Sequence, residues 1–313
     1  MPIIGASHLP PILHHYEASP FAELVRLALG LKQLKWQSVI IPNIMPKPDL
    51  VELTGGYART PVLQIGADIY CDTGAILAAL EHLKPEPSLY PAPLGALHKV
   101  MASWAGGPQF LAHVGAAMGT LPDGALPAAF YTDRKARFGF DMAGLAKAEP
   151  HLKSQALTAA HWLDATLADG RAFVGGDVPG HADLAFYSNI WLVRSVPSAA
   201  ATVAEIMALP ALATWCTRVA AIGHGEPEPI IGADAIAVAA GASPAAASAQ
   251  VVSGFATGEP VMVRTDGSHD TPVAGRLAQL DPTGICVLRT GDRCGAVAVH
   301  FPRLGQIVVP VEA

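Results

Sequence analysis

The alternation of strand-like and helix-like segments near the amino terminus is the feature that most restricts what this chain can form. Four stretches rich in branched and aromatic residues have strand character: 12–15, 36–41, 62–65 and 69–71. Three stretches have helical character: 20–32, with leucines at the three- and four-residue spacing of an amphipathic helix, 48–53 and 72–83. The order βαβαββα therefore predicts an α/β domain over residues 1–84.

Changes in composition divide the rest of the 313 residues. Residues 84–95 hold four prolines and are typical of a linker. Residues 96–223 contain long Ala- and Leu-rich helical windows, which predict an all-helical domain. An Ala-, Gly- and Pro-rich connector, 224–258, leads to five short strand-like stretches in 259–313. Turn-forming residues separate these stretches, and we expect a small β-barrel or sandwich there.

The charge balance excludes some functions. Only 15% of the residues are charged and 51% are hydrophobic, so the chain can bury a large core. Its net charge of −6 removes the attraction on which non-specific nucleic-acid binding depends. The region from Glu259 onward has five Arg, no Lys and more acids than bases, which argues against a nucleic-acid module there. We expect no nucleic-acid partner.

The chain also lacks the patterns of membrane, secreted and metal-binding proteins. Every long apolar run is interrupted by charge or proline, and no basic residue precedes Arg26. We therefore expect a cytoplasmic protein with no membrane segment. The four cysteines are scattered, without a CxxC or a paired Cys and His spacing: Cys71, Cys216, Cys286 and Cys294. This pattern argues against a disulfide scaffold, a dithiol centre and a metal site.

Four motifs stand in order along the chain: Ser19–Pro20 at a helix start, Thr60–Pro61 before a strand, Asp72–Thr73 at another helix start, and GGDVPGHADLAF at 175–186. With the segments HHYEASPFAELVRLALGLK and YARTPVLQIGADIYCDTGAILAALE, they closely resemble the glutathione S-transferase superfamily. The resemblance covers roughly residues 12–223. It implies a thioredoxin-like domain that binds glutathione, followed by a helical domain for the acceptor substrate.

Ser19 is the candidate catalytic residue. A hydroxyl at a helix N-terminus can donate a hydrogen bond to sulfur, and the helix dipole favours the thiolate. Both effects lower a thiol pKa from its free value of about 8.5. The surrounding Ala-Ser-Pro-Phe resembles the serine-type classes, especially the tau class, and implies this role for Ser19. The local sequence alone favours Ser19 as a plain N-cap, and the resemblance reverses this preference.

Tyr16 is the competing hydroxyl, since other classes of the superfamily use a tyrosine at the end of the first strand. The spacing to the helix, however, fits the alignment with the serine-type classes better. No cysteine occupies this place. Thiol transfer through a mixed disulfide on the protein, as in a thiol-disulfide reductase, is therefore the weaker interpretation.

The resemblance also implies the residues that bind glutathione. Thr60–Pro61 would form a cis-proline turn, so that the Thr60 backbone pairs with the cysteinyl unit. Thr73 would bind the γ-glutamyl carboxylate and Asp72 the α-ammonium, although both also fit a helix cap. Lys47 and Arg59 match cations near the glycyl carboxylate. Loop cations of this kind are otherwise solvated.

Asp183 resembles the acid of the helical domain's capping motif and is assigned to folding. The chain departs from the motif at Gly180, which stands where Ser or Thr normally caps and offers no side-chain acceptor. Half of the reciprocal capping box is therefore expected to be missing.

Together these residues predict a homodimeric glutathione transferase that directs the thiolate of its co-substrate at a small apolar electrophile. The acceptor pocket would lie between Ser19 and the helical domain, where candidate side chains also fit a helical core: Trp104, Phe110, His113, Met118, Phe130 and Tyr131. The alternative is a non-catalytic protein of the same fold that acts through its C-terminal β region.

Overall fold

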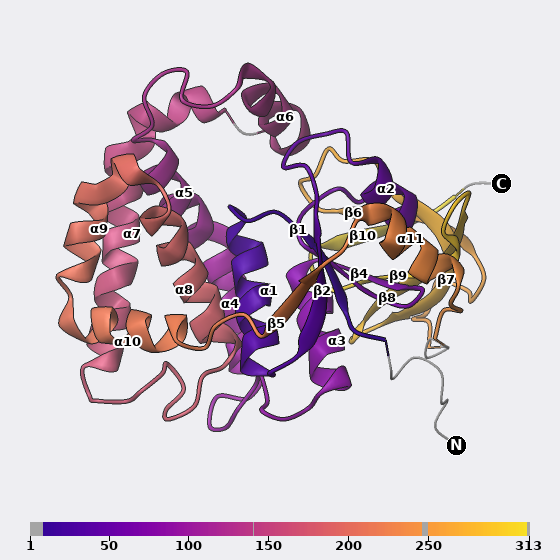
Figure 1. Ribbon diagram of the computed structural model, residues 1–313, viewed down its shortest axis with the longest axis horizontal. Coiled ribbons are helices and arrows are strands. Elements are labelled where there is room, and N and C mark those ends of the chain that lie inside the picture. Colours follow the sequence, from indigo (N-terminus) through magenta and orange to yellow (C-terminus); the bar gives the residue numbers. More distant parts are fainter. Residues whose placement is uncertain (1–8, 140, 246–249, 312–313) are drawn as a thin grey trace.

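A computed structural model describes residues 9–139, 141–245 and 250–311. Figure 1 shows a bundle of helices on one side and an extended sheet on the other, with helix α1 (Pro20–Leu31) between them. No single helix among the described residues is long and apolar enough to span a bilayer. Helix α8 (His181–Arg194) and residues 197–207 satisfy such a test of length and composition only as a pair, and that pair is bent by 98°.

The thioredoxin-like order predicted for the amino-terminal region is confirmed. Its elements are β1 (Ile12–His15), α1 (Pro20–Leu31), β2 (Lys35–Ile40), α2 (Pro48–Thr54), β3 (Val62–Ile65), β4 (Asp68–Cys71) and α3 (Thr73–Leu83). Strand β1 pairs in parallel with β2 and antiparallel with β3, and β3 pairs antiparallel with β4.

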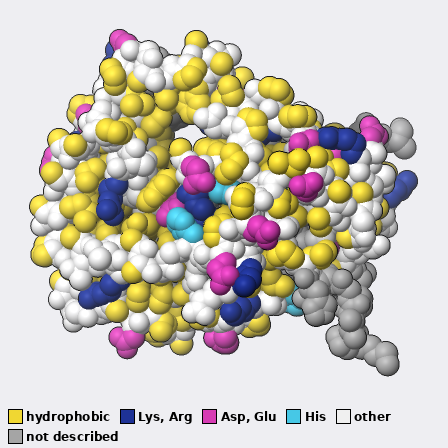
Figure 2. All heavy atoms as spheres, viewed as in Figure 1, with side chains coloured by type: hydrophobic (Ala, Val, Ile, Leu, Met, Phe, Trp, Pro, Cys, Tyr) yellow, Lys and Arg dark blue, Asp and Glu magenta, His cyan; other side chains and the backbone are white. Residues whose placement is uncertain are grey.

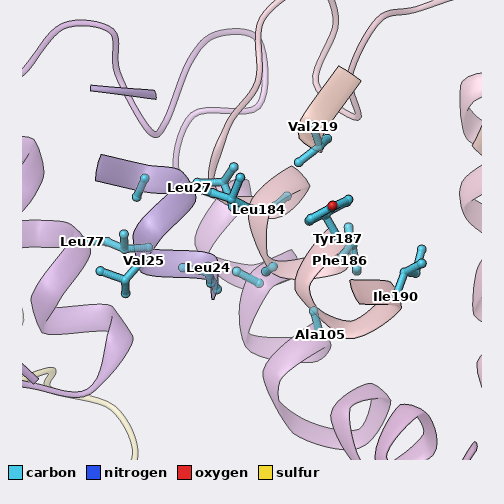
Figure 3. Close-up of a cluster of buried hydrophobic side chains, with 14 of the residues drawn as sticks. Leu24, Val25, Leu27, Leu77, Ala105, Leu184, Phe186, Tyr187, Ile190 and Val219 are labelled. Atoms are coloured by element: carbon cyan, nitrogen blue, oxygen red, sulfur yellow. The ribbon is translucent and has the colours of Figure 1, made fainter. Parts of the chain in front are cut away.

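The helical region is likewise confirmed. Its helices are α4 (Leu97–Trp104), a π-helical turn (Ala105–Gln109), α5 (Phe110–Met118), α6 (Ala128–Phe138), α7 (Leu145–Leu167), α8 (His181–Arg194), α9 (Ala200–Met207) and α10 (Pro210–Ala220). Helix α8 is buried along almost its whole length and packs against α1. Leucines of α1, such as Leu27, share one apolar cluster with Leu184 and Ile190 of α8 (Figure 3). This contact joins the two regions.

The C-terminal β region is present, but it is not the separate barrel or sandwich that we expected. After β5 (Glu226–Pro229) and α11 (Gly232–Ala240) come β6 (Pro260–Thr265), β7 (Val273–Asp281), β8 (Gly284–Gly291), β9 (Gly295–Phe301) and β10 (Gln306–Pro310). Within the described residues, the strands form one sheet of ten, in the order β10-β6-β7-β8-β9-β4-β3-β1-β2-β5. The region therefore extends the thioredoxin-like sheet at one edge.

The seam between the two parts of the sheet is the pairing of β4 with β9. The two strands run parallel, with Tyr70 opposite His300. His300 bonds Asp68 through Nε2 at 2.8 Å and stacks on Tyr70 with 4.6 Å between ring centroids. An unpaired edge strand exposes backbone donors and acceptors, and β9 satisfies those of β4. The backbone hydrogen bonds gained in this way explain why the C-terminal region joins the sheet instead of closing into a barrel of its own.

The predicted connector 224–258 contains one strand and one helix. Strand β5 adds to the far edge of the sheet beside β2, and α11 packs on α2. Residues 246–249 of this connector lie outside the described residues. The domain boundaries themselves stay predictions.

Asp183 caps α8, and its partner in the capping motif comes from a distant helix. The Asp183 carboxylate accepts hydrogen bonds from the backbone N–H groups of Gly180 and Val174, at 3.0 and 2.8 Å. His98 of α4 lies where a capping side chain would stand. Its Nδ1 accepts a hydrogen bond from Ala182 N–H at 3.3 Å. Burial lowers the pKa of His98, which favours the neutral ring that can accept this bond.

The missing half of the capping box is thus supplied by His98, and Gly180 is required because it leaves room for the ring. A Cβ added at position 180 would lie 2.3 Å from His98 Cε1.

We predict that Gly180→Ser lowers the free energy of unfolding by about 1–3 kcal/mol through this overlap. In a His98→Ala background the serine can cap α8 itself, so the same change should be neutral or stabilising. Urea unfolding of the four proteins measures both effects, and a Gly180→Ser chain as stable as wild type would contradict the assignment.

Candidate functional site

The predicted site residues gather at the carboxyl end of β1. Tyr16 and Ser19 follow this strand directly, and Thr60 precedes β3, which pairs with β1 so that His14 lies opposite Val62. In sheets of this kind ligands bind beyond the carboxyl ends of the parallel strands. The register of β1 and β3 therefore brings segments about 40 residues apart to one place.

Ser19 is the N-cap of α1. Its backbone is extended, with φ −85° and ψ 118°, and Pro20 follows at the first helical position. The Ser19 Oγ accepts a hydrogen bond from Ala22 N–H at 3.2 Å. Within the described residues its hydroxyl hydrogen has no acceptor, so it remains able to donate. The capping role and the predicted catalytic role are therefore compatible, although the side chain is only 2% exposed.

Tyr16 lies beside Ser19 and is more accessible. Its carbonyl accepts a hydrogen bond from Ser19 N–H at 3.2 Å, and its ring is partly exposed. The Lys47 ammonium lies 5.9 Å from the centre of the ring. The structure thus brings the two competing hydroxyl residues to the same end of β1.

Lys47 is buried and bonded, not solvated. It precedes α2, is 2% exposed, and donates hydrogen bonds to Ala58 O at 2.9 Å and Thr60 Oγ1 at 3.1 Å. Burial, aided by the nearby guanidinium groups of Arg137 and Arg134, lowers the pKa of Lys47 to about 7. An ammonium has three donors, so one remains for a ligand. A bound anion would stabilise the charged form.

Arg59 is partly exposed, and its side chain lies between an aromatic ring and an acid. Its guanidinium is 5.2 Å from the centre of the Phe138 ring, and its Nε is 3.8 Å from Asp270 Oδ2. The Nε atom is buried, yet no hydrogen-bond partner for it exists in the described part of the chain. The Arg59 side chain as a whole is 28% exposed, so its outer part can reach a ligand at the site.

The Thr60–Pro61 peptide bond is cis, as expected. Neither the N–H nor the C=O of Thr60 has a backbone partner within the described ranges. Both groups are thus available to pair with an extended peptide, while the Thr60 hydroxyl is engaged by Lys47.

Asp72 caps α3, whose first residue is Thr73. The Asp72 Oδ1 accepts a hydrogen bond from Gly74 N–H at 2.8 Å. The Asp72 backbone has φ +76° and ψ 144°, a conformation that costs a residue with a side chain about 1–3 kcal/mol. Burial raises the pKa of the Asp72 carboxyl, whereas the Gly74 N–H and the charge of Arg59 act against this rise. Strained backbone of this kind concentrates at binding sites.

Two further segments reach the site: helix α6, which carries the acceptor-pocket candidates Phe130 and Tyr131, and the turn between β6 and β7, which the sequence did not indicate. Helix α6 contacts the loop after β2, because Asp133 Oδ1 accepts from Met45 N–H at 2.9 Å and Arg134 donates to Asn43 O at 2.9 Å. The turn between β6 and β7 supplies Asp270, which binds Arg137 of α6 through two bonds of 2.6 and 3.0 Å. The surface is hollowed below the α6 segment, between the helices and the sheet (Figure 2).

An open groove of about 740 Å³ lies elsewhere, at the amino-terminal ends of β1 and β2, where Trp36 and Pro227 are among its lining residues. None of the predicted site residues lines this groove. Among the described residues no cluster of three or more His, Cys, Asp or Glu side chains is placed to hold a metal ion.

Comparison with known proteins identifies the family and the fold. Residues 13–88 match the family model described as glutathione S-transferase, N-terminal domain. Two glutathione transferases share the fold over 68% of this chain: the tau class enzyme of mango, Mangifera indica (18% identity, 89% of that chain, TM-score 0.52), and one from Phanerochaete chrysosporium (17% identity, 97% of that chain, TM-score 0.54). No curated protein matches the chain.

A GST-like protein from Pseudomonas syringae is similar over almost the whole length. It is 34% identical, the match covers 96% of this chain and 99% of that chain, and the TM-score is 0.80. A match over 96% of the chain includes the C-terminal β region, whereas the two enzymes above match over 68% of it. By this likeness and by its own amino-terminal domain, the chain belongs to the glutathione S-transferase superfamily.

Proposed function

We propose that the protein is a glutathione-dependent transferase of the serine type, acting in the cytoplasm, where its four buried cysteines stay reduced. One observation carries this proposal. The open backbone groups of Thr60, the buried ammonium of Lys47 and the hydroxyl of Ser19 converge at the carboxyl end of β1.

The chain offers each part of glutathione a matching group. The cysteinyl unit would pair with the Thr60 backbone, as a short added strand does. The glycyl carboxylate would bind Lys47 and Arg59. The γ-glutamyl end would lie at the start of α3, with its carboxylate at Thr73 and the helix N–H groups and its ammonium at Asp72.

In this arrangement Ser19 acts on the thiol. Its hydroxyl hydrogen donates to the sulfur, and the N-terminus of α1 adds positive potential, so the thiol loses its proton more readily. The thiolate then attacks an electrophilic carbon: a carbon–sulfur bond forms and the leaving group departs with its electron pair. The same thiolate supports conjugation, dehalogenation, ether cleavage and isomerisation.

The acceptor substrate is proposed to be small and apolar. Phe21, two residues after Ser19, contacts Phe110 of α5 with 4.6 Å between ring centroids. This pair offers an apolar wall beside the proposed thiolate. Trp104, another candidate, packs instead between Trp162 and Phe186 within the helical region.

We predict that Ser19→Ala lowers kcat/KM for conjugation of 1-chloro-2,4-dinitrobenzene by about 10²-fold, the usual effect of removing one stabilising donor. Glutathione affinity, measured by calorimetry, should change little because the protein groups that bind the peptide remain. Tyr16→Phe is the matched control and should keep most of the activity. If the alanine variant reacts as fast as wild type and Tyr16→Phe does not, Tyr16 is the catalytic hydroxyl. Binding without turnover in wild type would support the non-catalytic alternative.

The lowered pKa of Lys47 makes ligand affinity depend on pH. A bound carboxylate raises the pKa of Lys47 above its value of about 7 in the free protein. The affinity for the ligand is therefore highest below pH 7 and falls above pH 7, where Lys47 of the free protein loses its proton. We predict that S-methylglutathione, which has no thiol to titrate, binds progressively more weakly between pH 7 and 8.5, by up to about tenfold per pH unit. Lys47→Met should bind weakly at every pH. A flat profile in wild type would show that Lys47 does not meet the carboxylate.

The homodimer implied by the superfamily is part of the proposal, and an exposed apolar face supports it. Val100 of α4 is 65% exposed and Trp162 of α7 is 62% exposed. Trp104, one turn after Val100, stacks on Trp162 with 6.1 Å between ring centroids, so the face is continuous across two helices. Apolar faces of this kind mark protein contacts.

We predict that Val100→Glu converts the dimer to a monomer, as measured by sedimentation equilibrium, because a carboxylate would be buried without a partner. Ile231→Glu is the matched control, since Ile231 is equally exposed at 65% but lies next to α11. A wild-type chain that is monomeric at micromolar concentration, or a Val100→Glu chain that still dimerises, would contradict this interface.

A further inference from the structure

The C-terminal β region encloses the segment between β2 and β3 that carries Lys47, Arg59 and Thr60. The hairpin of β8 and β9 is hydrogen-bonded to the end of α2. Arg289 donates to the carbonyls of Glu52 and Leu53, at 2.5 and 3.2 Å. The Glu52 carboxylate in turn accepts backbone N–H groups of the hairpin, the shorter bond being 2.6 Å to Arg293. One side of the segment is thus fixed by the added strands.

The turn between β6 and β7 fixes the other side. It approaches the loop before Thr60 closely, since a Cβ added at Gly56 would lie 2.8 Å from Thr271 O. Gly56 also has φ +142°, which favours glycine. At the same turn His269 N–H donates to Arg137 O at 3.1 Å, which ties the turn to the end of α6. The turn therefore lies between α6 and the loop that presents Arg59.

Asp270 stands at the centre of this contact. Arg137 donates hydrogen bonds to both carboxylate oxygens of Asp270, at 2.6 and 3.0 Å, and the Asp270 side chain is largely buried. Arg59 lies 3.8 Å away, close enough for attraction but beyond hydrogen-bond distance, and its buried Nε–H stays unpartnered. The carboxylate therefore holds the guanidinium in place without occupying its donor.

We propose that Asp270 is a positioning residue for the glutathione site, and that through it the C-terminal β region sets the affinity for the peptide's carboxylate. Bound to Arg137, Asp270 draws the Arg59 guanidinium against the Phe138 ring, while the 28% of the Arg59 side chain that stays exposed can meet the ligand. This role rests on the proposed function. It makes the additional strands a component of the binding site and not a separate module.

Asp270 also acts on Lys47, whose pKa responds to every charge around it. Helix α6 presents Arg134, Arg137 and Asp133 to Lys47, the β6–β7 turn presents Asp270, and the Tyr16 ring lies 5.9 Å from it. Among these, the two acids raise the pKa of Lys47 and the two arginines lower it. Loss of the Asp270 charge should therefore move the pH profile of ligand binding to lower pH.

The test is a double-mutant cycle on S-methylglutathione affinity, measured by calorimetry at pH 6.5, with Arg59→Ala, Asp270→Asn and the double variant. We expect Asp270→Asn to weaken binding about tenfold in the wild-type background and by less than about twofold in the Arg59→Ala background, because coupled residues are not additive. The midpoint of the pH profile should also fall in Asp270→Asn. Asp266→Asn, an exposed acid of the same turn, should leave both unchanged.

Equal affinity for wild type and Asp270→Asn would overturn the role, and so would tighter binding, which would show that the carboxylate competes with the ligand. Additive losses in the cycle would also overturn it, since they indicate a structural effect independent of Arg59. If wild type does not bind S-methylglutathione, the proposed function fails and this role fails with it. If Asp270→Asn does not fold, Asp270→Glu takes its place in the cycle, with the same criterion of non-additivity and a smaller expected loss of about threefold.

Discussion

The parallel pairing of β9 with β4 is the contact on which the rest of this architecture depends. It converts the edge of a thioredoxin-like sheet into an internal strand and sets the direction in which the added strands run. Because the strands lie side by side, both the β8–β9 hairpin and the β6–β7 turn come to lie against the segment between β2 and β3. A region that could have formed its own core instead shares one with α2 and β4.

Helix α1 is the corresponding element on the other side of the molecule. Its N-terminus carries Ser19, while its leucines pack into the cluster with α8. Asp183 holds the start of α8 through two backbone bonds and a third bond from the Trp215 indole at 2.8 Å. Since buried polar groups with full sets of partners rigidify a core, the Ser19 hydroxyl, which we propose as the catalytic group, is presented from a fixed support. Charged side chains gather nearby, at the middle of the face in Figure 2.

Local patterns predicted what depends on neighbouring residues. The spacing of leucines in α1, the Ser19–Pro20 helix start and the Thr60–Pro61 turn act within a few residues, so the thioredoxin-like order followed from them, and they also indicated where the candidate site would lie. The Asp270–Arg137 pair joins residues 133 apart, and no local signal marks either side chain. Strand patterns in 259–313 fit a barrel and a sheet extension equally. The sequence did not explain Gly180, because the group that replaces the capping side chain comes from His98. This residue lies 84 positions before Ala182, whose N–H donates to its ring.

The seam between β4 and β9 has a consequence for how the chain is made. His300 and Asp68, bonded across it, are 232 residues apart. Domains generally begin to fold as they emerge from the ribosome, from the amino terminus onward. The edge of β4 must then stay uncovered until the last strands have been synthesised, and pairing at such sequence distance is slow. A nascent chain of this architecture therefore exposes the edge of β4 for a long interval. During that interval chaperones, or other copies of the chain, compete with β9 for the backbone groups of this edge.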